Sequence, residues 1–272
     1  MASLLANPLG RGTRRVPWLG CVRRYPPGTR RVPLPSILVA VFLALPGCDR
    51  TSPKPSAPPP AGPVRTGIGI IRGVVNLSGK PPEMAAIPNR PCHAGAPPLR
   101  DESVVTYGDG HLQNVIVYLQ DAPPAPIATT LPAFALDQVN CQFVPHVVGL
   151  RTGQTLHVSS GDPTLHNVHG LCTVNDAFNF ALIAAGQSKD LSFSQPERFP
   201  VRCDVHPWMK AYVQVFDSPY FAVTAKDGSF EICNVPPGTY TLIAWQERYG
   251  ELRRSVDVSD EHTAEASFEY RR

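Results

Sequence analysis

Apolar positions along the chain come in short runs, many of them alternating with polar residues, and Pro, Gly and Asp-Gly turn signals separate them. No apolar pattern with helical period extends beyond about two turns, whereas period-two runs rich in β-branched and aromatic residues are frequent. The pattern therefore predicts an all-β protein, organised as a sandwich or a barrel. Strands are expected at 68–77, 115–119, 134–136, 143–150, 155–158, 191–193, 201–203 and 211–216, with further strands at 222–232 and 235–245.

The first 66 residues differ from this pattern. An Arg-rich stretch leads into nine apolar residues at 37–45, which are too few to span a bilayer and are typical of a secretory signal. The following Leu-Pro-Gly-Cys, ending at Cys48, resembles a bacterial lipobox, although an ordinary signal peptide with an incidental Cys is the alternative. We expect residues 1–48 to be a signal, 49–66 to be a Pro-rich extended linker, and acyl chains on Cys48 to anchor the protein in a membrane. The expected location is the periplasm or the cell surface.

The overall charge of +3 is unevenly distributed. Residues 1–47 contain seven Arg and no acidic residue, and subtracting these seven charges from +3 leaves −4 for the rest of the chain. A nucleic-acid-binding function is therefore not expected, because the basic excess belongs to the leader.

A cluster of soft metal ligands occurs at the sequence Cys-Asp-Val-His-Pro-Trp-Met, where Cys203, His206 and Met209 are spaced three residues apart. The chain has only three Met, so one at this position after Cys-x-x-His is unlikely by chance. Two His, one Cys and a weak axial Met are the ligands of blue-copper centres. The loop needs one more His, and His166 in the upstream His-Asn-Val sequence is the obvious donor.

Together these two motifs resemble those of the cupredoxins, most closely the amicyanin and plastocyanin type, over about residues 134–216. The resemblance implies a Greek-key β-sandwich that binds one copper ion through His166, Cys203, His206 and Met209. It also implies that Asn167 braces the Cys203 loop and that Pro207 fixes the chain after His206. The expected function is electron transfer with a redox protein such as a c-type cytochrome or an oxidoreductase. No nucleophile–base set or phosphate-binding loop is evident, so we do not expect an enzyme.

Other interpretations of the same residues stay open. Cys203, His206, His166 and His169 could form a tetrahedral zinc site, although this leaves Met209 unused. The protein could also carry or store copper without redox turnover, or be an interaction module whose metal is structural.

The seven cysteines agree with an oxidising compartment. Besides Cys48, Cys203 and one Cys in the leader, four remain and allow three pairings. We favour disulfides between Cys92 and Cys141 and between Cys172 and Cys233.

Residues 218–272 contain different turn sequences between their predicted strands, with Asp-Gly-Ser-Phe at 227–230 and Pro-Gly-Thr-Tyr at 237–240. This resembles the small transthyretin-like sandwich called the carboxypeptidase regulatory-like domain. The first strands of that family resemble residues 73–79 and 115–119. The expected organisation is a copper domain at 67–217 with an N-terminal β extension, followed by a segment at 218–272 that could pair with strands in 67–120. The copper module would then be inserted within the smaller sandwich.

Overall fold

The computed structural model describes residues 69–88, 98–123, 125, 131–260 and 262–272. These residues form strands, turns and loops without a helix, which confirms the predicted all-β fold. Within the described ranges, no helix is long and apolar enough to cross a membrane. The expected leader and linker, together with Cys48 and Cys92, lie outside the described residues.

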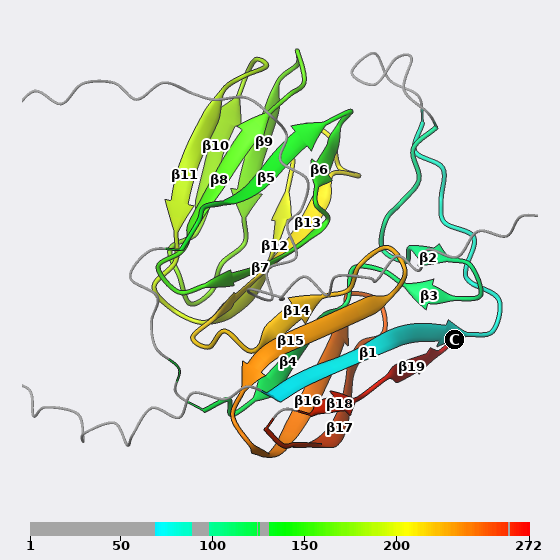
Figure 1. The fold of residues 1–272 in the computed structure, drawn as a ribbon. Coiled ribbons are helices and arrows are strands. Elements are labelled where there is room, and N and C mark those ends of the chain that lie inside the picture. Colours follow the sequence, from blue (N-terminus) through cyan, green and yellow to red (C-terminus); the bar gives the residue numbers. More distant parts are fainter. Residues whose placement is uncertain (1–68, 89–97, 124, 126–130, 261) are drawn as a thin grey trace, which may run out of the picture. The chain divides into compact units, whose positions relative to one another are not determined.

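The middle of the chain forms two packed sheets that we call the first sandwich (Figure 1). One sheet has the strand order β10-β9-β12-β13-β7, and the other has the order β11-β8-β5-β6. Alternating side chains such as Leu136, Leu156 and Phe199 point inward from both sheets and form one core. The strands are β5 (Phe134–Val139), β6 (Gln142–Val144), β7 (Val147–Arg151), β8 (Thr155–Ser160), β9 (His166–Gly170), β10 (Phe178–Leu182), β11 (Ser188–Ser192), β12 (Glu197–Arg202) and β13 (Lys210–Phe216).

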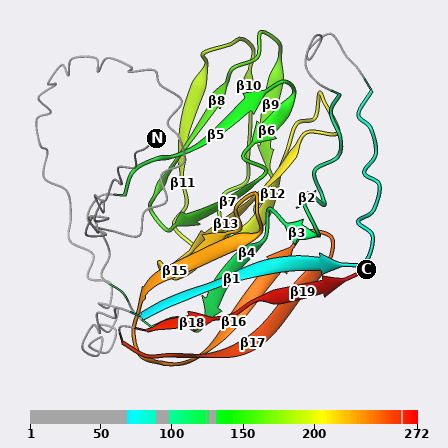
Figure 2. The same ribbon diagram turned by 45° about the vertical axis from the view of Figure 1, so that its right-hand side comes forward.

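Strands from both ends of the described chain form the second sandwich (Figure 2). One of its sheets has the order β15-β1-β3-β2, with β18 and β19 also paired to β1, and the other has the order β14-β4-β16-β17. The strands are β1 (Gly69–Ser78), β2 (Thr106–Tyr107), β3 (His111–Leu112), β4 (Ile116–Gln120), β14 (Phe221–Val223), β15 (Ser229–Val235), β16 (Gly238–Gln246), β17 (Gly250–Val258), β18 (Thr263–Glu265) and β19 (Phe268–Arg271).

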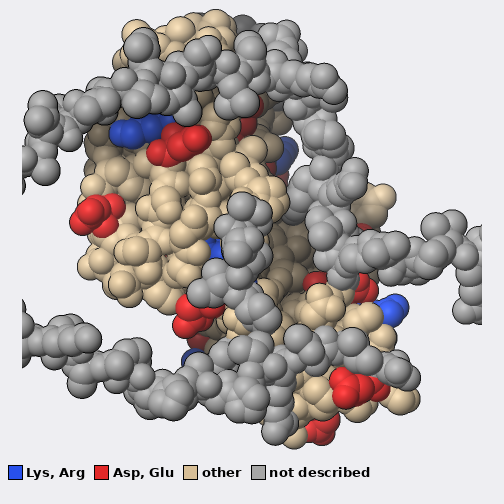
Figure 3. Space-filling model, turned by 60° about the vertical axis from the view of Figure 1, so that its left-hand side comes forward, with Lys and Arg blue, Asp and Glu red and all other residues tan. Residues whose placement is uncertain are grey.

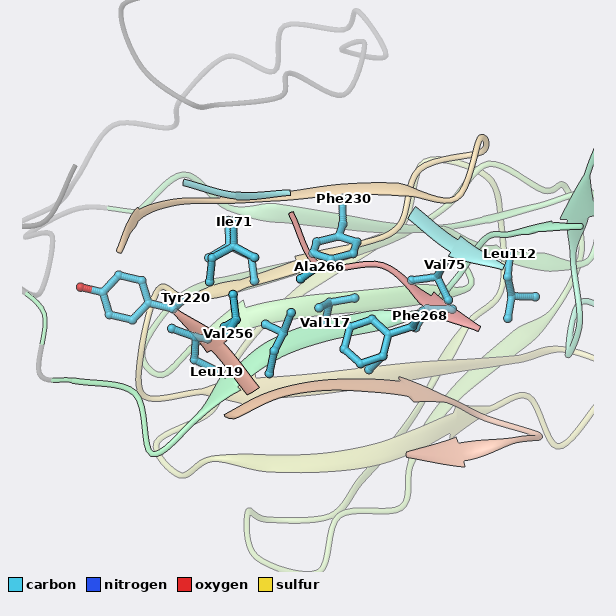
Figure 4. Packing of buried hydrophobic residues seen from close by; sticks show 14 of the residues in the cluster. Ile71, Val75, Leu112, Val117, Leu119, Tyr220, Phe230, Val256, Ala266 and Phe268 are labelled. Atoms are coloured by element: carbon cyan, nitrogen blue, oxygen red, sulfur yellow. The ribbon is translucent and has the colours of Figure 1, made fainter. Parts of the chain in front are cut away.

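Apolar side chains from both sheets form the main core cluster of the second sandwich. Figure 4 shows Ile71 and Phe230 on one side of this core and Leu119 and Val256 on the other. Full burial of each such aliphatic or aromatic side chain contributes about 1.5–3 kcal/mol. Gly73 allows the chain to pass closely beside β1, because a Cβ there would lie 2.2 Å from the carbonyl oxygen of Ala266.

The first sandwich is inserted between two neighbouring strands of the second. The chain leaves the second sandwich after β4 and returns at β14, and these strands pair antiparallel with Tyr118 opposite Phe221. Since β4 also pairs with β16, residues from 67–120 and from 218–272 form the same sheets. The N-terminal strands therefore belong to the second sandwich and are not an extension of the first.

A mixed apolar and ionic contact joins the two sandwiches. Val147 and Phe216 of the first sandwich pack in one buried cluster with Ile116 and Trp245 of the second. Beside this cluster, the Arg198 guanidinium lies 4.4 Å from the centre of the Trp245 ring, in cation–π geometry. The two sandwiches thus share a buried interface in addition to their covalent connections.

One predicted strand is divided in the structure. Residues 143–150 are rich in apolar residues and are predicted to form a single strand, but they contribute to β6 in one sheet and β7 in the other. Pro145 lies at the break, where it lacks the N–H group that a continuous ladder would require. The divided segment connects the two sheets of the first sandwich, a connection that apolar alternation alone does not predict.

Charged side chains are sparse on the face of the molecule shown in Figure 3. Small groups of acidic and basic residues are separated there by wide uncharged surface. Charges of both signs lie on this face, so its described part does not present a field of one sign.

Candidate metal centre

The predicted metal loop is a short connection between two paired strands. β12 ends directly before Cys203, β13 begins directly after Met209, and Arg202 pairs with Lys210 at the base of the loop. The Cys203 N–H donates to the Met209 carbonyl oxygen at 3.1 Å, and the Met209 N–H donates to the His206 carbonyl oxygen at 2.8 Å. These bonds close the loop, so the backbones of Cys203 and Met209 lie next to each other although five residues separate them in sequence.

The distant His166 reaches this loop because its strand belongs to the same sheet. His166 is the first residue of β9, and β9 pairs with β12 through His169 opposite Arg202. The His166 Nδ1 atom lies 4.0 Å from the Cys203 Sγ atom and 3.0 Å from the His206 Nδ1 atom. The Cys203 Sγ atom lies 3.7 Å from the His206 Nδ1 atom.

These distances fit a single metal ion. Metal–nitrogen and metal–sulfur bonds of about 2.0–2.3 Å place the donor atoms of one ion roughly 3–4 Å apart. One thiol, two imidazoles and a thioether are also the donor types that suit copper. The residues present therefore fit a mononuclear site with His166, Cys203 and His206 as its nearest donors.

The candidate site is closed on most sides. His166, Cys203 and Met209 are at most 2% exposed, and Cys203 and Met209 belong to the apolar core of the first sandwich. His206 is half-buried. The Trp208 ring lies beside it at a centroid distance of 5.2 Å. The edge of His206 is therefore the part of the site nearest to solvent.

Asn167 connects β9 to the metal loop through hydrogen bonds to Asp204. Its Oδ1 atom accepts the backbone N–H of Asp204 at 2.6 Å, and its Nδ2 atom donates to the Asp204 carboxylate at 2.7 Å. The same Nδ2 atom donates to Asn179 of β10 at 2.8 Å. Hydrogen bonds from His169 and Asn167 lower the pKa of Asp204. Pro207, the other residue expected to shape the loop, is exposed beside His206.

His169, the fourth ligand of the zinc alternative, faces away from the centre. It lies three residues after His166 on β9, and residues three apart on a strand point to opposite faces of a sheet. Its Nδ1 atom is 3.1 Å from both carboxylate oxygens of Asp204. The described structure therefore does not bring His169 together with the other three residues.

Cys141 is a second sulfur near the two histidines. Its Sγ atom lies within 4.8 Å of ring nitrogens of both His166 and His206. Cys141 is held in a disulfide, however, whereas the Cys203 thiol is free. A metal-binding thiolate must be free of a disulfide, so Cys203 is the sulfur that can serve as ligand. The Trp208 Nε1–H donates to the Cys141 carbonyl oxygen at 3.0 Å, which fixes the loop against this residue.

The expected disulfide between Cys172 and Cys233 is wrong. The Cys172 thiol is free, while Cys233 is disulfide-bonded. Cys172 follows β9 in the first sandwich, whereas Cys233 lies on β15 in the second, so the two cysteines belong to different cores. Burial, reinforced by the Glu197 carboxylate, raises the pKa of the Cys172 thiol to about 11. The pairing of Cys92 with Cys141 stays a prediction because Cys92 lies outside the described residues.

Sequence reasoning missed one buried carboxylate at the site. Asp162 lies in the connection between β8 and β9, and its Oδ2 atom is 2.9 Å from the Nε2 atom of His166. An acidic residue four positions before a predicted His ligand was the available signal. The contact depends on how the chain folds between the strands, so the spacing alone does not establish it.

Comparisons with known proteins give partial matches. A family model described as polysaccharide lyase family 4, domain II, matches residues 205–266. No curated protein matches the chain. A reduced mutant of amicyanin is 22% identical, with 31% of this chain and 82% of that chain covered and a TM-score of 0.29. Another amicyanin mutant, in a reduced Cu(I) form, is 21% identical, with 32% and 86% covered and a TM-score of 0.30.

A copper-containing nitrite reductase from Thermus scotoductus SA-01 is 18% identical to the chain. The match covers 36% of this chain and 26% of the reductase, with a TM-score of 0.31. Each of these matches covers about a third of this chain. What the site can bind is therefore judged from its own donor atoms.

Proposed function

We propose that this protein is a mononuclear copper protein that transfers electrons, with His166, Cys203, His206 and Met209 as ligands. The observation that carries the proposal is the convergence of the Cys203 Sγ, His166 Nδ1 and His206 Nδ1 atoms within 3.0–4.0 Å of one another. Copper at this position would supply a one-electron change between Cu(I) and Cu(II).

The donor set favours copper over zinc. A thiolate and a thioether are soft ligands, and a His₂Cys set with a weak Met is characteristic of copper electron-transfer sites. Met209 is buried in the same core as Cys203. His169, the fourth ligand of the zinc alternative, bonds to Asp204 instead. These residues therefore support a copper site with three strong donors and one weak one.

The surroundings of the site support electron transfer, and we propose that the protein is not an enzyme. The cavity beside Trp208 and Met209 has a volume of about 10 Å³, which is room for roughly one water molecule. Buried strand ends and the closed loop hold the ligands in place, so little rearrangement is needed when the charge of the site changes. The half-buried His206 is the natural point of electron entry and exit.

The cellular setting in the proposal comes from the leader and linker. We propose export to the periplasm or the cell surface, a lipid anchor at Cys48, and a redox protein partner such as a c-type cytochrome or an oxidoreductase. The support is the Arg-rich apolar leader with its Leu-Pro-Gly-Cys ending and the Pro-rich segment that follows.

The test is spectroscopy of the purified protein loaded with copper. We expect an intense visible band from charge transfer between the Cys203 thiolate and Cu(II), and we expect a mild reductant to bleach it reversibly. A protein that binds Cu(I) tightly but never shows this band would be a copper carrier or store. Exclusive binding of zinc, with no response to reductant, would make the metal structural. Either result would overturn electron transfer.

A further inference from the structure

Asp162 is a buried carboxylate with three donors around it. It is 4% exposed, and its Oδ1 atom accepts the backbone N–H of Asn140 at 2.7 Å. Its Oδ2 atom accepts the backbone N–H of Cys141 at 2.8 Å and lies 2.9 Å from the Nε2 atom of His166. Both oxygens already accept backbone N–H groups, which can only donate. The carboxylate therefore meets His166 as an acceptor, and His166 has to place its proton on Nε2.

We propose that Asp162 is the positioning residue that sets the tautomer of His166 and presents its Nδ1 lone pair to the metal. A neutral imidazole carries one N–H, so a proton held on Nε2 leaves Nδ1 as the lone-pair atom. That Nδ1 atom is the one that lies 3.0 Å from His206 Nδ1 and 4.0 Å from Cys203 Sγ. The inference rests on the proposed copper function and names a residue that controls it.

The carboxylate also has an electrostatic consequence for the site. The Asp162 carboxyl group lies 2.9 Å from His166, in a buried setting where charges are weakly screened. A negative charge there would stabilise Cu(II) more than Cu(I), because the oxidised ion carries the larger positive charge. It would thereby lower the reduction potential relative to the same site with a neutral partner.

Asp162 also stabilises a turn of the backbone, and the test has to separate this contribution from the positioning of His166. Asn140 and Cys141 both have positive φ angles, 54° and 56°, and the carboxylate holds the two N–H groups of this turn. The carbonyl of Cys141 in turn accepts the Trp208 N–H from the metal loop. Loss of Asp162 would loosen the turn, so a fall in stability alone does not distinguish positioning from bracing.

The first measurement needs no variant and no metal. Nitrogen-15 NMR of the metal-free protein, at a pH where His166 is neutral, reports which ring nitrogen carries the proton. We expect the Nε2–H tautomer for His166. The Nδ1–H tautomer there would overturn the proposal, even if the protein proves to be a copper electron carrier. Failure of copper to give the charge-transfer band would count against the function and would leave this tautomer result intact.

The second measurement compares Asp162→Asn with Asp190→Asn. Asp190 forms the same kind of pair, with His157 Nδ1 at 2.6 Å, but both residues are exposed and lie on β11 and β8 rather than at the centre. We expect Asp162→Asn to raise the reduction potential and to weaken Cu(II) binding by about 10–100-fold. The control variant should match the wild type in both properties. A folded Asp162→Asn protein with unchanged potential and Cu(II) affinity would show that Asp162 only braces the turn.

Discussion

The two sandwiches bury polar side chains in different ways. In the second sandwich, the buried Thr224 hydroxyl donates to the Leu112 carbonyl, and the buried Gln246 amide donates to the Ser103 carbonyl. In the first sandwich, the ring nitrogens of His166 and His206 and the sulfur of Cys203 face one another. Side chains that satisfy the backbone hold a fold together, whereas donor atoms that converge on one point can bind a cation. The contrast is consistent with the proposal that the inserted first sandwich binds the metal and that the second sandwich, its host, supports it.

Among substitutions that distinguish the two sandwiches, replacement of Cys203 should have the largest effect on copper binding. Cys203→Ser keeps the size of the side chain but removes the soft thiolate, so we expect the visible charge-transfer band to disappear. Cu(II) affinity should fall by more than the roughly 100-fold that outer ligand partners can cause. The control is Cys172→Ser, which changes the other free thiol among the described residues and should leave spectrum and affinity unaltered. A persistent band in the Cys203 variant would contradict the assignment of the sulfur ligand.

Truncation of a core side chain in the second sandwich should lower stability without changing the copper spectrum. Leu242 on β16 is fully buried in the second sandwich, and Leu242→Ala should lower the free energy of unfolding by about 2–5 kcal/mol. Chemical denaturation measures this loss, and the copper spectrum of the folded variant should match the wild type. An altered spectrum would mean that the host core determines the shape of the metal site.

The ionic contact between the sandwiches offers a smaller effect. The Glu247 carboxylate lies in the second sandwich and is 2.6 Å from the His146 Nε2 atom and 3.0 Å from the Lys210 Nζ atom, directly after Met209. Burial acts to raise the pKa of Glu247, but hydrogen bonds from His146 and Lys210 lower it overall. Glu247→Gln removes this charge at nearly constant size and should cost about 1–3 kcal/mol of stability.

Glu251→Gln is the matched control for this junction. Glu251 also crosses the interface, to Arg198 at 3.3 Å, but both side chains are partly exposed. Exposed ion pairs contribute about 0–1 kcal/mol, so thermal unfolding should change little. Equal losses in the two variants would show that burial of Glu247 does not strengthen the junction.

The last comparison concerns acid sensitivity in a loop of the first sandwich. Burial acts to raise the pKa of Glu197, but the N–H groups of Thr173, Val174 and Asn175 outweigh it and lower the pKa from 4.5 to about 2. A carboxyl group with a depressed folded pKa contributes stability above its unfolded value and loses it as the pH falls through the folded value.

We therefore expect the stability of the wild type to decline between about pH 4.5 and pH 2. In Glu197→Gln this decline should be shallower, because the group that takes up the proton is missing. Unfolding curves recorded across this range give the comparison. If the free energy of unfolding depends on pH in the same way in both proteins, Glu197 is not a source of acid sensitivity.

The most accurate predictions from the sequence concern features that depend on residues close together in the chain. The alternating runs located most of the strands in the two cores, and the contiguous spacing of Cys203, His206 and Met209 identified the loop. The contact of His166 with this loop followed from its motif and required a resemblance as well. The strands and the loop depend on residues that are close in sequence. The metal ligands belong to a few residue types, which leaves few possible ligand sets.

Long-range features were harder to predict for physical reasons. Strand pairing depends on which edges meet in space, so the parallel pairing of β1 with both β18 and β19 left no local signal. The error at Cys172 has the same origin, since an even number of cysteines does not say which of them are close. Asp162 escaped notice because a buried carboxylate and an exposed one look alike in sequence.

The insertion of one sandwich into the other has a consequence for how such a protein can be built. The Leu119 N–H donates to the Tyr220 carbonyl oxygen at 3.1 Å, so the two points where the guest module joins its host are hydrogen-bonded neighbours. The guest therefore occupies the position of a hairpin turn, and a short turn could in principle replace it. The entropy of closing a loop rises only logarithmically with its length, so a host hairpin tolerates a long passenger that folds on its own. With this architecture, the first sandwich, which is proposed to bind the metal, could be removed or replaced while the second sandwich keeps its strand order.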